Sequence, residues 1–122
     1  MPKRFFIPHW ASIIVLVLLT YAVYQGSLNV PFMWDDEGLI LQDEQIRSLN
    51  NIPRFFNLTY LEEDAAVTFR PLRTVSFAID YFLWEYNPYG YHLTNLFFHI
   101  FNVLLVYFFV HFLLSHPSSL IS

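Results

Sequence analysis

Residues 10–28 have the sequence WASIIVLVLLTYAVYQGSL, which contains no Asp, Glu, Lys or Arg. A helix of this length is about 28 Å long, which matches the roughly 30 Å hydrocarbon core of a bilayer. The stretch therefore predicts a transmembrane helix. The alternative is a signal peptide, because Lys3 and Arg4 precede the apolar run. The run is longer than a usual signal sequence, and Tyr21 and Tyr24 lie where cleavage requires small residues.

A second uncharged stretch follows near the other end of the chain. Residues 91–114, YHLTNLFFHIFNVLLVYFFVHFLL, are long enough to cross a bilayer with some tilt. All 10 acidic residues lie between the two stretches, whereas two basic residues precede the first. Since positive charge favours the cytoplasmic side, we expect residues 1–9 and 115–122 to be cytoplasmic. Residues 29–90 then form an extracytoplasmic loop.

The composition excludes several classes of protein. Charged residues make up 13% of the 122 residues and hydrophobic residues 56%, whereas a soluble domain has about 25% charged residues. The fold class predicted is therefore an all-α, multi-pass integral membrane protein. A net charge of -4 gives no basic surface for nucleic acid. The absence of cysteine excludes disulfides and cysteine-based zinc sites.

The loop is predicted to contain short ordered elements. Asp43 is expected to cap a turn over residues 44–49, and Asn51 to cap a turn containing Pro53. Residues 71–85 are expected to form a helix that starts at a proline, and residues 87–90 to form a turn. Apolar residues share one face of that helix at positions 72, 75, 78, 79, 82 and 83. Because we expect no partner core within the loop, we predict an interfacial helix that docks on lipid.

Three acidic residues, Asp35, Asp36 and Glu37, follow the first span almost directly. Negative charge near lipid headgroups is unfavourable unless the carboxylates bind a cation, pair with arginine or take part in a reaction. A carboxylate whose pKa is raised by such surroundings can serve as a general base. A solvated acidic turn that only fixes the topology is the equal alternative.

Two arginines lie at the start of the predicted interfacial helix. Arg70 and Arg73 are close to backbone N–H groups and to the positive end of the helix dipole, and together these groups favour an anion such as phosphate. In the alternative, one of these arginines pairs with Asp80 or with the acidic residues of the loop. An exposed ion pair of this kind contributes only about 0–1 kcal/mol to stability.

The second span carries a stripe of polar residues on one helix face, formed by His92, Asn95, His99 and Asn102. Polar groups at that depth face protein or a wet cavity, and hydrogen bonds between helices are the favoured interpretation for the two asparagines. Two histidines seven positions apart fit chelation poorly. We therefore predict no metal site here.

Several runs of residues resemble a known family. They are residues 32–36 (FMWDD), 45–49 (QIRSL), 51–53 (NIP), 69–72 (FRPL), 76–81 (SFAIDY) and 87–96 (NPYGYHLTNL). In this order they resemble the N-terminal part of the transmembrane and TPR-containing protein O-mannosyltransferases and of their bacterial TPR-bearing relatives. Those proteins belong to the GT-C class of polytopic glycosyltransferases. Family members have more spans followed by TPR repeats, which this sequence does not show, so a fragment is expected.

The resemblance implies a reaction and roles for particular residues. A protein Ser or Thr hydroxyl would attack a mannose-like sugar on a polyprenyl-phosphate donor. Asp35 would take the proton, Asp36 would orient the acceptor or a divalent cation, and Arg70, helped by Arg73, would stabilise the departing phosphate. Because Glu37 follows the two aspartates, the match to the acidic pair of the family could be shifted by one position. Supporting roles would fall to Glu37, Asp80, His92 and Asn95.

The resemblance also implies a setting. The partners would be the lipid bilayer, the lipid-linked sugar donor, a protein acceptor and the remaining transmembrane helices of a longer protein. The location would be a bacterial inner membrane or the endoplasmic reticulum membrane, with the loop on the outer or lumenal side. The alternative function is a two-span membrane scaffold without catalysis, in which the acidic residues serve only topology.

Overall fold

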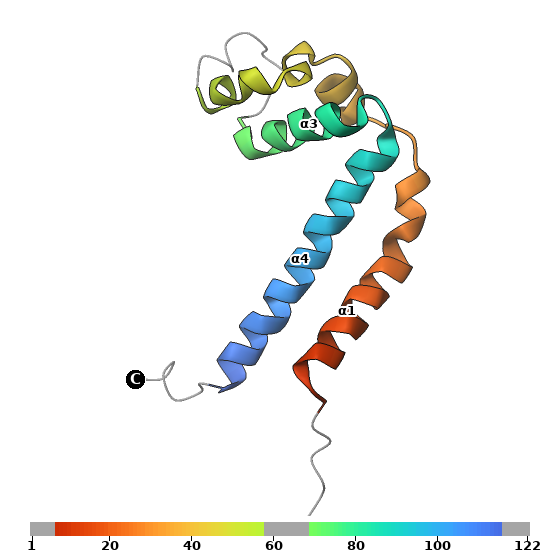
Figure 1. Ribbon diagram of the computed structural model, residues 1–122, viewed down its shortest axis with the longest axis vertical. Coiled ribbons are helices and arrows are strands. Elements are labelled where there is room, and N and C mark those ends of the chain that lie inside the picture. Colours follow the sequence, from red (N-terminus) through yellow and green to blue (C-terminus); the bar gives the residue numbers. More distant parts are fainter. Residues whose placement is uncertain (1–6, 58–68, 116–122) are drawn as a thin grey trace, which may run out of the picture. The chain divides into compact units, whose positions relative to one another are not determined.

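The structure is a computed structural model that describes residues 7–57 and 69–115 (Figure 1). It is all-helical in these ranges, with two long apolar helices and shorter helices between them, which confirms the predicted fold class. The chain divides into two compact units. Unit 1 contains residues 1–26 and 95–122, and unit 2 contains residues 27–94. Two sets of residues used in the sequence analysis lie outside the described ranges: the basic residues Lys3 and Arg4, and the acidic residues 62–64.

The first long helix is α1, His9–Tyr24, and the tighter helix η1, Gln25–Asn29, continues it. Residues His9–Asn29 form a candidate membrane span with a mean hydropathy of 1.8. The hydroxyl of Thr20 donates a 2.7 Å hydrogen bond to the Leu16 carbonyl, so this polar side chain is satisfied within its own helix. The predicted span 10–28 thus agrees closely with the helix.

The second long helix is α4, Pro88–Ser115, and it is the other candidate membrane span, with a mean hydropathy of 2.1. It begins three residues before the predicted position, and the predicted turn over residues 87–90, closed by a 3.2 Å bond from the Gly90 N–H to the Asn87 carbonyl, leads directly into its first turn. The Asn87 Oδ1 accepts a 3.1 Å hydrogen bond from the Tyr89 backbone N–H, as a helix cap does. The backbone leaves the helical conformation just before α4, at Glu85, whose φ is 51°.

Three short helices occupy the first half of unit 2: η2, Glu37–Leu41, η3, Glu44–Arg47, and η4, Leu49–Phe56. The predicted cap is confirmed at Asp43, whose Oδ1 accepts a 2.9 Å bond from the Gln45 N–H.

The predicted cap at Asn51 is wrong. The Ser48 Oγ caps η4 by accepting a bond from the Asn50 N–H. The Asn51 side chain instead donates a 2.9 Å hydrogen bond to the Gln45 carbonyl, which joins η4 to η3. A side chain that is used to link two elements is not available to cap either of them.

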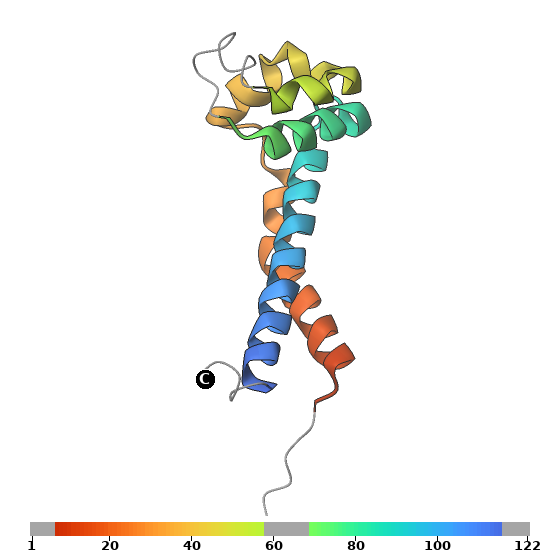
Figure 2. The ribbon, with the colours of Figure 1, turned by 90° about the vertical axis from the view of Figure 1, so that its left-hand side faces the viewer.

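Helix α3, Pro71–Trp84, starts at the predicted proline. Contrary to expectation, unit 2 has a hydrophobic core against which α3 packs. Helices η3 and η4 lie along one side of α3 in both views (Figures 1 and 2). The buried cluster consists of Ile40, Ile46, Phe55, Ala78 and Tyr91. The expectation that the loop has no partner core failed because the short helices and the first turn of α4 each supply an apolar side chain.

The end of α3 is packed closely on the start of α4. The hydroxyl of Tyr91 donates a 2.8 Å bond to the Glu85 carbonyl, and the Tyr91 ring makes an edge contact with Phe32 at 5.1 Å between centroids. A Cβ added at Gly90 would collide with the Trp84 ring. Glycine is required here because the indole occupies the space that any larger side chain would need.

Candidate functional site

The acidic residues after the first span form a turn that begins a helix. The Met33 backbone N–H donates a 3.1 Å hydrogen bond to Asp36 Oδ2, and the Asp36 N–H donates a 3.2 Å bond to the Met33 carbonyl. The bond from the Met33 N–H to the Asp36 side chain is the one that an acidic residue makes at the third position of a capping box, and the bond to the Met33 carbonyl closes a backbone turn. Asp36 therefore has a structural role at this turn, which sequence spacing alone does not show.

Asp35 differs from its neighbour. Its side chain is exposed, and it makes no hydrogen bond or ion pair with any residue in the described ranges. Glu37 is also exposed and forms the first residue of η2. Asp35 and Glu37 thus both have carboxylate oxygens that are open to an external hydroxyl, whereas one oxygen of Asp36 is already engaged by the backbone.

The residue before the acids, Trp34, has a strained backbone. Its φ is 56°, a left-handed conformation that costs a residue with a side chain about 1–2 kcal/mol. The Trp34 side chain is also 89% exposed, so burial within the described chain does not offset that cost. Strain of this kind is retained where the conformation serves a function.

The two arginines lie at the start of α3, as predicted. Arg70 is exposed and occupies the N-cap position, and its carbonyl accepts hydrogen bonds from both the backbone N–H and the hydroxyl of Thr74. Arg73 is half-buried on the first turn. Within residues 7–57 and 69–115, Arg70 forms no ion pair with Asp35 or Asp36. The structure therefore does not bring the predicted base and the predicted phosphate-binding group into direct contact.

Asp80 is a buried acid whose partner is Thr94. Its exposed fraction is 3%, and its Oδ1 accepts a 2.6 Å bond from the Thr94 hydroxyl, which ties α3 to the first turns of α4. Burial raises the pKa of the Asp80 carboxyl above its ordinary value, although the hydrogen bond from Thr94 acts in the opposite direction. Asp80 therefore links two helices, and its supporting role in a reaction stays a prediction.

The raised pKa of Asp80 predicts a pH-dependent stability. The folded chain holds this proton more tightly than the unfolded chain, so the stabilisation is complete below the ordinary pKa of 3.8 and is lost as the pH rises through the folded-state pKa. Asp80→Asn keeps an acceptor for Thr94 without ionising. Unfolding in detergent micelles between about pH 4 and about pH 7 should therefore show a weaker loss of stability with pH in this variant. The exposed control Glu44→Gln should behave as the parent chain does, and an unchanged slope in Asp80→Asn would contradict the assignment.

The polar stripe on α4 is divided between different environments. The Nε2 of His92 lies 2.8 Å from the Val30 carbonyl, and the His99 ring makes an edge contact with Tyr24 at 4.6 Å between centroids. Asn95 and Asn102 are exposed and form no hydrogen bond in the described part of the chain. The histidines thus face protein as expected, whereas the predicted interhelical hydrogen bonds of the asparagines are not formed there.

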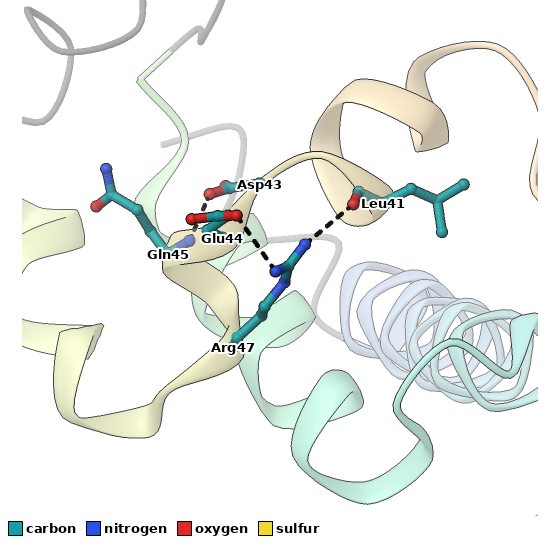
Figure 3. Close-up of polar contacts among 5 residues, drawn as sticks. All are labelled: Leu41, Asp43, Glu44, Gln45 and Arg47. Atoms are coloured by element: carbon teal, nitrogen blue, oxygen red, sulfur yellow. Dashed lines mark hydrogen bonds and ion pairs between the residues drawn. The ribbon is translucent and has the colours of Figure 1, made fainter.

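Sequence reasoning missed the role of Arg47. Its guanidinium donates to the Leu41 carbonyl at 3.3 Å and pairs with Glu44 at 3.5 Å (Figure 3). It also lies over the Tyr86 ring, 5.9 Å from the centroid. Arg47 therefore joins η2, η3 and the segment after α3. Only its spacing of three from Glu44 was visible in the sequence, and the other two contacts depend on the fold.

A second cluster that the sequence did not indicate lies in unit 1. The Nδ1 of His9 is 2.7 Å from the Tyr107 hydroxyl, and the His9 and His111 rings are 4.5 Å apart between centroids. These contacts join the start of α1 to the last turns of α4. Nearby, Tyr107 and His111 help to line a mainly apolar groove of about 690 Å³. In the described ranges, no group of three or more His, Cys, Asp or Glu side chains could hold a metal ion.

Known proteins resemble this chain over most of its length. Protein O-mannosyl-transferase TMTC3 of Homo sapiens is 30% identical over 93 residues, which is 72% of this chain and 10% of the human protein. Protein O-mannosyl-transferase Tmtc1 of Drosophila melanogaster is 31% identical over 94 residues, 73% of this chain and 11% of the fly protein. The chain is a distant homologue of part of these transferases. It spans about a tenth of their length.

The resemblance to protein O-mannosyltransferases noted from the residue runs is thereby confirmed for a partial region. No family model matches the chain, and no solved structure matches it. Membership of the GT-C class and the roles of individual residues stay predictions.

Proposed function

We propose that this chain forms two membrane spans and the intervening extracytoplasmic segment of a protein O-mannosyltransferase. The enzyme would move a mannose-like sugar from a polyprenyl-phosphate carrier to a Ser or Thr hydroxyl of a protein. The observation that carries this proposal is the similarity to the human and fly transferases over about three quarters of the chain. The two candidate membrane spans support it, because a lipid-linked donor is reached only from the membrane.

The proposed roles follow from the environments of the side chains. Asp35 is the general base, because it is the first acid of the run FMWDD that carries the resemblance, and its exposed carboxylate has no partner in the described ranges. Asp36 holds the turn through its bond to the Met33 N–H and directs its second oxygen to the acceptor or a cation. Arg70, exposed at the start of α3, stabilises the charge that develops on the leaving phosphate.

Arg70 makes no direct contact with the two aspartates, and the proposed reaction explains why none is needed. The sugar lies between the hydroxyl that attacks its anomeric carbon and the phosphate that leaves from the opposite face. The base and the phosphate-binding group must therefore be separated by the substrate. A base in direct ion pair with the arginine would be held in its charged form and would accept the proton less readily.

The topology completes the proposal. Residues 29–90 lie outside the cytoplasm, and both ends of the chain face the cytoplasm, in accordance with the distribution of basic residues. The acid turn begins six residues after the end of the first candidate span, which ends at Asn29. A donor whose phosphate lies at headgroup level would present its sugar close to that height.

A chimera tests the proposed function. In the human relative, the matched segment of 93 residues would be replaced by the corresponding residues of this chain. Membranes containing the chimera should transfer mannose from polyprenyl-phosphate mannose to a Ser/Thr peptide. A control chimera that carries an unrelated two-span hairpin should not. A chimera that inserts correctly and transfers no mannose would contradict the proposal and favour the scaffold function.

A further inference from the structure

A segment without helix or strand leads from the first candidate span to the acidic turn. The span ends at Asn29, and residues 30–33 belong to no helix or strand. The Val30 N–H donates to the Ser27 carbonyl, which links the segment back to the span but not onward to the turn. Because such a segment has little regular hydrogen bonding to hold it, the position of Asp35 depends on contacts from other elements.

Two neighbouring residues at the start of α4 make such contacts. The Nε2 of His92 lies 2.8 Å from the Val30 carbonyl, and the Tyr91 ring makes an edge contact with Phe32 at 5.1 Å between centroids. A carbonyl oxygen can only accept a hydrogen bond, so the His92 Nε2 carries the proton and donates it. The segment is therefore held at two points, by one polar contact and one apolar contact.

The start of α4 is itself a firm support. Tyr91 is 3% exposed, and its hydroxyl donates a 2.8 Å hydrogen bond to the Glu85 carbonyl. The Thr94 hydroxyl donates a 2.6 Å bond to Asp80 of α3. These contacts fix the first turns of α4 within unit 2. We propose that Tyr91 and His92 form a clamp on residues 30–33 and thereby position the turn that carries Asp35.

His92 is the member of the clamp that can be replaced without opening the core. Tyr91 belongs to the buried cluster, whereas His92 is half-buried and holds Val30 through a hydrogen bond. In the proposed enzyme the clamp sets where Asp35 meets the attacking hydroxyl, a role that rests on the proposed function. A displacement of about 1 Å at a reacting group can lower a rate about 10²-fold. His92 is thus a positioning residue, which acts through the backbone and needs no contact with the donor or the acceptor.

Pairs of spin labels can test the clamp, because the chain contains no cysteine of its own. The pair Glu37→Cys and Leu93→Cys reports the distance between η2, which follows the acidic turn, and α4. The control pair, Glu44→Cys and Ile79→Cys, reports the packing of η3 on α3. All four side chains are exposed, so labelling preserves the core. Distance distributions would be measured by pulsed electron paramagnetic resonance on the full chain in detergent micelles, with His92, with His92→Leu and with His92→Gln.

In His92→Leu, the distribution between positions 37 and 93 should broaden about twofold, because the released segment samples more positions. The distribution between positions 44 and 79 should keep its parental width. His92→Gln should stay narrow at both pairs, since the glutamine amide N–H can reach the same carbonyl. An unchanged width between positions 37 and 93 in His92→Leu would overturn the inference. Broadening of both pairs would also overturn it, because His92 would then support the whole unit and not the turn.

The role in the reaction is measured in the chimera with the human relative. His92→Leu should lower kcat about tenfold while the KM for the donor changes by less than about twofold, and His92→Gln should recover most of the rate. His99→Leu makes the same change at another histidine of α4 and should transfer at the parental rate. Broadened distances with an unchanged kcat would remove the positioning role. An inactive parent chimera would contradict the proposed function instead, and the spin labels would still decide whether the clamp exists.

Discussion

An Asp35→Asn variant of the chimera with the human relative is expected to transfer mannose about 10²–10⁴-fold more slowly than the parent chimera, the range typical for loss of a general base. The amide has the shape of the carboxylate but cannot accept a proton from the attacking hydroxyl. The measurement is the initial rate of mannose transfer in membranes with saturating donor. The amount of inserted protein would be measured in parallel and should not change.

The matched control for this variant is Glu44→Gln, which makes the same chemical change at an exposed carboxylate of unit 2. It should transfer at the parental rate. Asp36→Asn should also lose transfer while the turn is retained, because an amide oxygen can still accept the bond from the Met33 N–H. Full activity in both Asp35→Asn and Asp36→Asn would remove the acid turn from the catalytic assignment.

The Phe55→Ala variant is expected to lower the free energy of unfolding by about 3–5 kcal/mol, the usual cost of truncating a buried phenylalanine. Phe55 is 0% exposed and contributes to the same cluster as Ile46 and Tyr91. The loss should be seen as a lower denaturant midpoint when the chain is unfolded in detergent micelles and followed by tryptophan fluorescence.

The neighbouring residue supplies the control. Phe56 is the same residue type on the same helix, but it is 52% exposed. Phe56→Ala should therefore change the free energy of unfolding by less than about 1 kcal/mol. Equal losses in the two variants would show that Phe55 does not belong to a buried core in unit 2.

The long helices were predictable from the sequence because a bilayer imposes a simple requirement. An uncharged run of sufficient length is enough to indicate a candidate span, and the predicted range 10–28 lies entirely within His9–Asn29. The start of α3 was equally predictable, since proline fits the first helical position. These elements depend on local residues alone.

The core of unit 2 was not predictable in the same way. Ile40, Ile46, Phe55 and Tyr91 come from four separate elements, and no periodic pattern connects them. The cap of η4 was misassigned for a related reason, because the Asn51 side chain is used to reach the Gln45 carbonyl. At the candidate site, the sequence identified the acids and the arginines. It could not show that Asp36 is bound to the Met33 N–H, that Asp80 is buried against Thr94, or that Arg47 reaches the Leu41 carbonyl.

Tyr91 belongs both to the core of unit 2 and to a candidate membrane span. During synthesis, the segment between the two spans therefore lacks one of its interior side chains until the start of the second span has been made. The core of this segment therefore cannot be completed before the first turn of α4 has been made. A nascent chain stalled before residue 91 should accordingly be open to protease, and should become resistant once the next few turns of helix have been added.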